Sequence, residues 1–207
     1  MSSRTSTTRR VPLKARPWDF IYASFLAVHI PATLLIDCQA VYPSTYKPWF
    51  LEALMQWYHA AFRDPLIGGI SGRFNSKHGL GGGGGEGLEW FKTFVYLELI
   101  FQLPIFIIGF LGLYHNNKKV YPVLLAYAAS SATTTLACLV SLWTTPESTP
   151  ARLAQDVPCV SAVQRAVLVG SYASFFVVPL VMALDLAGRL VRMCGEADGE
   201  KEKTKTK

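Results

Sequence analysis

Four long apolar runs divide the chain. They cover residues 20–42, 94–114, 120–143 and 166–186. A helix needs about 20 apolar residues to cross the hydrocarbon core of a bilayer, and each run is long enough. The first run follows basic residues, but it is longer than the core of a signal peptide and lacks a small-residue cleavage site. We therefore predict an all-α integral membrane protein with a bundle of four transmembrane helices over residues 18–189.

The second run contains a carboxylate, Glu98. An ionisable side chain at the centre of a spanning helix costs about 2.5 to 3.5 kcal/mol on insertion scales, so it normally faces the interior of a bundle. Gln102 lies one turn further on the same face, and Pro104 leaves the carbonyl of Ile100 without its usual amide partner. We expect this face to form the wall of a polar site.

The other runs add further polar side chains. His29, Thr33 and Asp37 recur at intervals of four, which places them along one side of the first helix. Two structural interpretations stay open, because His29 can serve helix packing alone and Asp37 can cap the helix at the membrane interface. The fourth run adds Tyr172. The third run carries hydroxyl side chains for which we expect close helix packing and interhelical hydrogen bonds, namely Ser130, Ser131, Thr133, Thr134 and Thr135.

A shorter amphipathic segment lies between Pro48 and Pro65. It is apolar and aromatic apart from one stripe of polar residues, Glu52, Gln56, His59 and Arg63. The segment is too short to span, so we expect a helix at the membrane interface or over the mouth of the bundle. Asp64 is expected at the C-terminus of this helix, where the helix dipole disfavours an anion. Either Asp64 has a function or it belongs to a solvated Asp-Pro turn.

Two segments lack the pattern of packed helices. Residues 68–87 are glycine-rich and aperiodic, which predicts a flexible insertion; no flanking strand or Lys-Ser/Thr ending supports a phosphate loop. Residues 190–207 form a charged tail that we expect to be disordered. The last residues place Lys203 and Lys205 in the KxKxx pattern of dilysine retrieval to the endoplasmic reticulum, although a generic basic tail is the alternative.

Composition and charge fit a membrane protein. The chain is 51% hydrophobic and 16% charged. Thirteen of its twenty Lys and Arg residues lie in residues 1–17, in the turn at 115–119 and in the tail from Arg189 onward. The positive-inside rule makes that side cytosolic, so both termini are expected in the cytosol and the amphipathic helix in the lumen. The net charge of +6 follows this topology, and we expect no nucleic-acid partner.

The four cysteines show no spacing typical of metal ligands, and we expect neither a metal nor a cofactor. Free thiols are the simplest interpretation of Cys38, Cys138, Cys159 and Cys194. A bridge between Cys38 and Cys159 stays open if both face an oxidising lumen.

Three blocks of sequence resemble the sigma-2 receptor family. They are HIPATLLIDCQA from His29, FRDPL from Phe62, and WFKTF with ELIFQLP between Trp90 and Pro104. That family carries the EXPERA domain, shared with emopamil-binding sterol isomerases, and the similarity covers about residues 17–189 in matching order. The insertion at 68–87 and Phe175, where animal members have tyrosine, depart from the animal pattern, and we place the chain among the fungal members.

The resemblance implies a protein of the endoplasmic reticulum with a ligand cavity that opens toward the bilayer and binds sterols and cationic amphiphiles. The role of counter-ion for the ligand falls on Asp37, with support from Asp64, while Glu98 and Gln102 would line the same cavity. None of the three acids has an intramembrane Lys or Arg partner in the sequence, so we expect them to share a proton that a protonated amine can replace.

Two classes of function are consistent with this resemblance. The first is a lipid-binding receptor or regulator, with a second copy or another membrane protein as open partners. The second is a sterol isomerase. The isomerase relatives use a His and a Glu spaced by four on the second helix, whereas Phe94 lies four residues before Glu98 here. We therefore favour binding over catalysis. A third alternative, from the fungal branch, is assistance to mitochondrial precursors at the endoplasmic reticulum.

Overall fold

The fold is all-helical with four spanning segments. The computed structural model describes residues 11–74 and 87–205, and these contain no β-strand beyond one isolated bridge between Glu147 and Val160. Four helical stretches are long and apolar enough to cross a membrane: Pro17–Ala40, Glu89–Tyr114, Lys118–Thr144 and Ala162–Thr204. The predicted class, an integral membrane protein with four transmembrane helices, is confirmed.

Several spans are composite. The first consists of α1 (Pro17–Leu35) and the 3₁₀ turn η2 (Asp37–Ala40). The second joins α5 (Glu89–Leu97), the π-helical turn η4 (Glu98–Gln102) and α6 (Leu103–Tyr114). The third and fourth are α7 (Tyr121–Thr144), preceded by η5 (Lys118–Val120), and α9 (Ala162–Lys205). The shorter elements are η1 (Leu13–Ala15), η3 (Ser44–Tyr46), α2 (Trp49–Phe62), α3 (Pro65–Ile70) and α8 (Pro150–Ala154).

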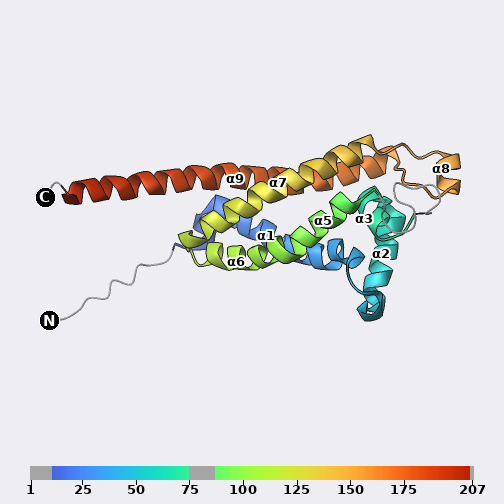
Figure 1. Ribbon diagram of the computed structural model, residues 1–207, viewed down its shortest axis with the longest axis horizontal. Helices are drawn as coiled ribbons and strands as arrows, with labels where there is room; N and C mark the ends of the chain where they lie inside the picture. Colours follow the sequence, from blue (N-terminus) through green and yellow to red (C-terminus); the bar gives the residue numbers. More distant parts are fainter. Residues whose placement is uncertain (1–10, 75–86, 206–207) are drawn as a thin grey trace.

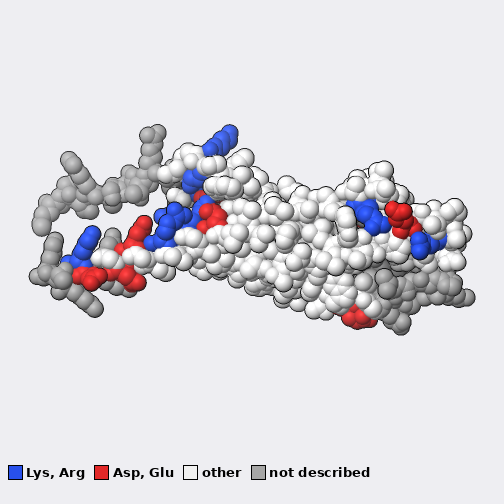
Figure 2. Space-filling view, turned by 90° about the horizontal axis from the view of Figure 1, so that it is seen from above, with Lys and Arg blue, Asp and Glu red and all other residues white. Residues whose placement is uncertain are grey.

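The spans run side by side along the long axis, with α2, α3 and α8 gathered at one end, here called the capped end (Figure 1). Helix α7 packs mainly against α9, and α1 packs mainly against α6. The turn between α6 and α7 lies at the end opposite the cap (Figure 1). Figure 2 shows charged side chains at both ends of the molecule and an uncharged surface between them, as a bilayer-embedded band requires.

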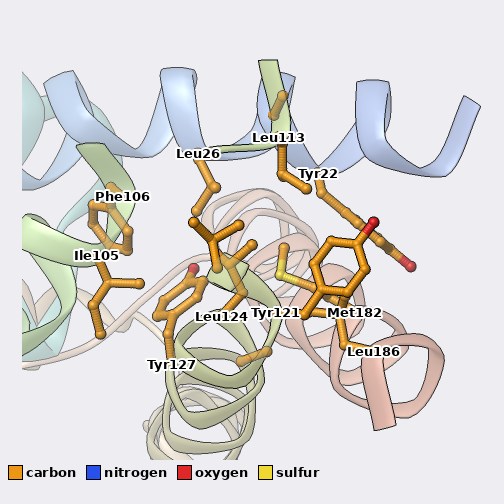
Figure 3. Packing of buried hydrophobic residues seen from close by; sticks show 13 residues of the cluster. Tyr22, Leu26, Ile105, Phe106, Leu113, Tyr121, Leu124, Tyr127, Met182 and Leu186 are labelled. Carbon is orange, nitrogen blue, oxygen red and sulfur yellow. The ribbon is translucent and has the colours of Figure 1, made fainter. Parts of the chain in front are cut away.

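The bundle is held by an apolar cluster contributed by α1, α6, α7 and α9 (Figure 3). Leu26, Phe106, Leu124 and Met182 meet there and are each fully buried. Gly109 of α6 lies against this cluster, and a Cβ added to it would collide with the side chain of Leu124. Association of helices in a membrane depends on close packing rather than on water exclusion, so a small residue at this crossing lets the helices approach.

A network of ion pairs joins the first and last spans at the end opposite the cap. Asp19 of α1 is buried and pairs with both Arg16 and Arg189, the latter at 2.5 Å. Arg189 also pairs with Asp185 at 2.7 Å, and Tyr22 donates a hydrogen bond to Asp185. Breaking one member of such a network leaves another charge buried and unpaired, so the network fixes α1 against α9.

Two boundaries differ from those predicted. The tail expected to be disordered continues α9 through Lys205, because its Leu, Arg, Met, Ala, Glu and Lys residues favour helix whatever their charge. The segment expected to be a flexible insertion begins inside α3, where Gly68 and Ile70 are buried. The run Gly81–Gly85 and the N-terminal residues 1–10 lie outside the described residues.

Candidate functional site

A cavity of about 190 Å³ lies within the bundle, between side chains of all four spans and of α2. Five of the seven predicted ligand-binding residues line it: His29, Asp37, Glu98, Gln102 and Tyr172. The other two, Thr33 and Asp64, lie behind its wall and are almost fully buried. The structure therefore brings together, around one cavity, residues that are widely separated in the sequence.

The π-helical turn places Glu98 and Gln102 on the cavity. Pro104 has no amide hydrogen to donate, and the turn immediately before it is wider than an α-helical turn. The amide of Leu103 donates to the carbonyl of Glu98, five residues back, which is the π-helical pattern. Such bulges occur often at functional sites in membrane and soluble helices. The local sequence thus produces the irregularity that shapes this wall.

Glu98 is held by two side chains of the first span. The hydroxyl of Thr33 donates to its Oε1 at 2.5 Å, and Nε2 of His29 lies 3.4 Å from the same oxygen. The other ring nitrogen of His29, Nδ1, lies 3.3 Å from the hydroxyl of Tyr127. The imidazole also stacks on Phe106, with ring centroids 4.5 Å apart. His29 therefore does more than fill space, because both of its nitrogens have polar neighbours in the site.

Asp64 is a hydrogen-bonding centre at the capped end. Its Oδ1 accepts from the backbone amides of Leu66 and Ile67, and its Oδ2 accepts from the hydroxyls of Tyr58 at 2.8 Å and Tyr172 at 3.0 Å. Burial raises the pKa of the Asp64 carboxyl, and the four donated hydrogen bonds oppose that rise. With these four donors bound, Asp64 holds the two cavity tyrosines in place.

The predicted place of Asp64 at a helix C-terminus is wrong. Helix α2 ends at Phe62, and Arg63 adopts a left-handed conformation with φ of 47°. This turn redirects the chain, so that Asp64 caps the N-terminus of α3 and Pro65 is the first residue of that helix. Aspartate is among the best residues for capping a helix N-terminus, so Asp64 stabilises the first turn of α3.

Asp37 differs from the other two acids. It follows α1 in the turn η2 and lines the cavity, yet its carboxylate forms no hydrogen bond or ion pair with any described side chain or backbone group. The charged groups that act on it are Glu98 and Asp64, both of like sign. An acid in this setting is a ready acceptor for a cation that enters the cavity.

Sequence reasoning missed two contributions to the site. Tyr58 lies on the side of α2 that faces the bundle. Nothing in the sequence pattern distinguished it from an aromatic residue that only fills the core. Four residues of α7 also line the cavity: Ser131, Thr134, Thr135 and Cys138. The hydroxyl-rich stretch of the third run was the available signal, and we assigned it to packing. All four cysteines are free, so Cys38 and Cys159 are not bridged.

Replacing Thr33 with valine is expected to lower the free energy of unfolding by roughly 1 to 2 kcal/mol, because the change keeps the shape but leaves Glu98 without its hydroxyl donor. Thr134→Val is the matched control, since the Thr134 hydroxyl bonds only backbone carbonyls of its own helix among the described residues. Thermal unfolding of the purified protein in detergent measures the difference. Equal shifts in the two variants would contradict a stabilising role for the bond between Thr33 and Glu98.

The fold and the site together define a class: a four-span membrane protein whose bundle encloses a small cavity with acidic and aromatic side chains around it. Residues 50–186 match the family model described as EXPERA (EXPanded EBP superfamily). The chain therefore belongs to the EXPERA family.

Known relatives come from animals and from yeasts. Sigma intracellular receptor 2 of Xenopus tropicalis is 30% identical over 83% of this chain and 89% of its own length. The human protein of the same name is 27% identical over 84% of this chain and 89% of its own length. Efficient mitochondria targeting-associated protein 19 of Saccharomyces cerevisiae is 26% identical over 77% of this chain and 91% of its own length. The predicted relation to the sigma-2 receptor family is confirmed.

Proposed function

We propose that this protein binds a sterol or another lipid, and cationic amphiphiles, in the acidic cavity of its bundle. In this role it acts as a receptor or regulator of sterol handling rather than as an enzyme. The proposal is supported by the similarity to Sigma intracellular receptor 2, which extends over most of both chains. It is also supported by the apolar and aromatic walls of the cavity, which suit a hydrophobic ligand with one polar end.

The main support for this proposal is that the carboxylate of Asp37 lines the cavity without a hydrogen-bond donor among the described residues. Asp64 accepts four hydrogen bonds and Glu98 is held by Thr33 and His29, whereas Asp37 has no donor among the described residues. A cationic head group that entered the cavity would supply the missing donor and offset the repulsion from the two neighbouring acids. Asp37 is therefore the counter-ion that a cationic ligand would meet.

The size of the cavity limits how a ligand sits. About 190 Å³ is less than the roughly 300 to 1,000 Å³ typical of sites for drug-sized molecules. The cavity accommodates the polar end of an amphiphile and an adjoining ring, while the remainder of a sterol would extend between the helices or require them to separate. A ligand that is polar at one end and apolar along its length fits this arrangement.

Purification in mild detergent followed by mass spectrometry of the copurifying lipids tests the proposal. A sterol is expected in the sample at a level near that of the protein, and an excess of a cationic amphiphile should displace it. Retention of the sterol under a saturating amphiphile, or ordinary phospholipids as the sole copurifying lipids, would contradict a shared cavity site.

We further propose residence in the endoplasmic reticulum with both termini in the cytosol. Two contacts indicate that the basic segments lie at the same end of the bundle. Arg16 of the N-terminal segment donates to the carbonyl of Leu113, beside the basic turn between α6 and α7, and Arg189 of the last helix pairs with Asp19 of α1. Basic segments gathered at one end of a bundle favour the cytosolic side.

Changing Lys203 and Lys205 together to serine is expected to let the protein leave the endoplasmic reticulum, because the KxKxx pattern depends on those positions. Fluorescence microscopy of the tagged variant against an organelle marker measures the loss, with Lys201→Ser as the matched control in the same tail. An unchanged location of the double variant would show that the tail is not the retrieval signal.

The second candidate function is isomerisation of a sterol. The observation that favours it is the approach of His29 to Glu98, which supplies from the first span the histidine that the second span lacks. An acid and a base within reach of one cavity can donate and remove a proton. Incubation of the purified protein with a sterol alkene, with His29→Ala as control, distinguishes the two functions by the presence or absence of a rearranged product.

A further inference from the structure

Two of the three faces of helix α2 contact the rest of the protein. One face is directed to the bundle, where Leu51 and Met55 are buried. A second face is the polar stripe, and it is occupied by the segment after α3. Glu52 pairs with Arg73 at 2.5 Å, and His59 packs edge-on against Phe74 at 4.8 Å between ring centroids. The third face has no contact of this kind within the described part of the chain.

The third face is apolar and uncharged. Trp49, Phe50 and Trp57 are 83%, 50% and 60% exposed, and the smaller positions on the same arc of the helix are alanines, Ala53, Ala60 and Ala61. Single exposed apolar residues are ordinary on protein surfaces, but three large aromatics on one continuous face are not. We call Trp49, Phe50 and Trp57 the aromatic face of α2. It has no apolar partner on another element among the described residues.

The position of α2 indicates which partner this is. The helix lies crosswise to the spans at the capped end, so its axis follows the plane of the membrane (Figure 1). It starts nine residues after the first span ends at Ala40. Trp143, at the end of the third span near the same end, is also exposed. Trp and Tyr concentrate where a membrane protein crosses the boundary between acyl chains and head groups.

We propose that the aromatic face of α2 inserts into the interfacial layer of the adjacent lipid leaflet and anchors the cap of the cavity there. A second copy of the chain fits the face less well. An aromatic side chain buries roughly 150 to 250 Å², so the three together would bury about 450 to 750 Å². That area is below the about 800 Å² that each partner buries in a stable interface. Because Tyr58 on the inner side of α2 donates to Asp64, the same helix joins the leaflet to the wall of the cavity.

Fluorescence quenching in phosphatidylcholine vesicles tests this proposal without any cavity ligand. Variants of the full chain that keep one tryptophan, Trp49 or Trp57, have the other four replaced by phenylalanine. Lipids brominated near the head group should quench both strongly, and aqueous iodide should quench them weakly. The control is Gln155→Trp in the tryptophan-free chain, since Gln155 is exposed directly after α8 and should show the opposite order.

Depth measurement on a nitroxide label tests the same face with all tryptophans present. The label is attached at Ala53→Cys in a chain that also carries Cys194→Ser, because Cys194 is the exposed native thiol. Collisions with dissolved oxygen should exceed those with a water-soluble nickel complex.

In the fluorescence experiment, quenching of Trp49 or Trp57 by iodide at the level of the Gln155→Trp control would overturn the proposal. Protection from both bromine and iodide would also overturn it, because the face would then be covered by protein.

Discussion

Replacing Asp37 with asparagine is expected to weaken the binding of a cationic amphiphile by about 2 to 5 kcal/mol, the usual cost of removing one partner from a buried charge pair. The carboxylate lines the cavity and has no other donor among the described residues, so the ligand's cation is the group that loses its partner. A neutral sterol should lose far less, because it offers no charge to Asp37. Equilibrium binding of both ligand types to the purified protein measures the two losses.

The control for this variant changes the same charge outside the cavity. Glu147 is exposed in the connection between α7 and α8, so Glu147→Gln removes one negative charge without touching the site. This variant should bind both ligands as the unmodified protein does. Equal losses of cation and sterol binding in Asp37→Asn would remove the counter-ion role and assign Asp37 to the structure of the turn that follows α1.

Hydropathy predicted the spans because crossing a bilayer is a matter of apolar length. It did not predict where the helices end. The second helix begins at Glu89 rather than at Phe94, since the segment between them buries Phe91 and exposes Lys92 in an amphipathic extension. The last helix continues to Lys205 because charged residues can be good helix formers. An apolar run marks the thickness of the membrane, whereas a helix ends where its backbone loses hydrogen-bond partners or meets a breaker.

The parts of the site that were predicted lie within single helices. A spacing of four placed His29 with Thr33, and Glu98 with Gln102. Glu98 and Gln102 both line the cavity, and His29 and Thr33 both contact Glu98, His29 from the cavity and Thr33 from behind its wall. The surroundings of Asp64 follow from a left-handed turn and from a tyrosine 108 residues away in sequence. Such contacts depend on how the helices pack against one another, which the local pattern does not specify.

Replacing Asp64 with alanine is expected to lower the free energy of unfolding by about 2 to 4 kcal/mol. Loss of an N-terminal cap costs about 0.5 to 2 kcal/mol. Each of the two buried donors left without an acceptor adds about 1 kcal/mol, the lower end of the usual range, because water in the cavity can replace the lost partner. The donors affected are the hydroxyls of Tyr58 and Tyr172. Thermal and denaturant unfolding in detergent measure the change.

Asp64→Asn separates the shape of this side chain from its charge. Asparagine caps helices about as well as aspartate, so this variant should lose less stability than Asp64→Ala. Because burial raises the pKa of Asp64, the folded protein holds that proton more tightly than the unfolded chain. The contribution of Asp64 is therefore full below the ordinary aspartate pKa of about 4 and declines as the pH rises through the folded value. Asparagine cannot titrate, so the stability of the unmodified protein relative to Asp64→Asn should fall with rising pH. A constant difference, or one of opposite slope, would show that the four hydrogen bonds outweigh burial and that the folded protein prefers the carboxylate.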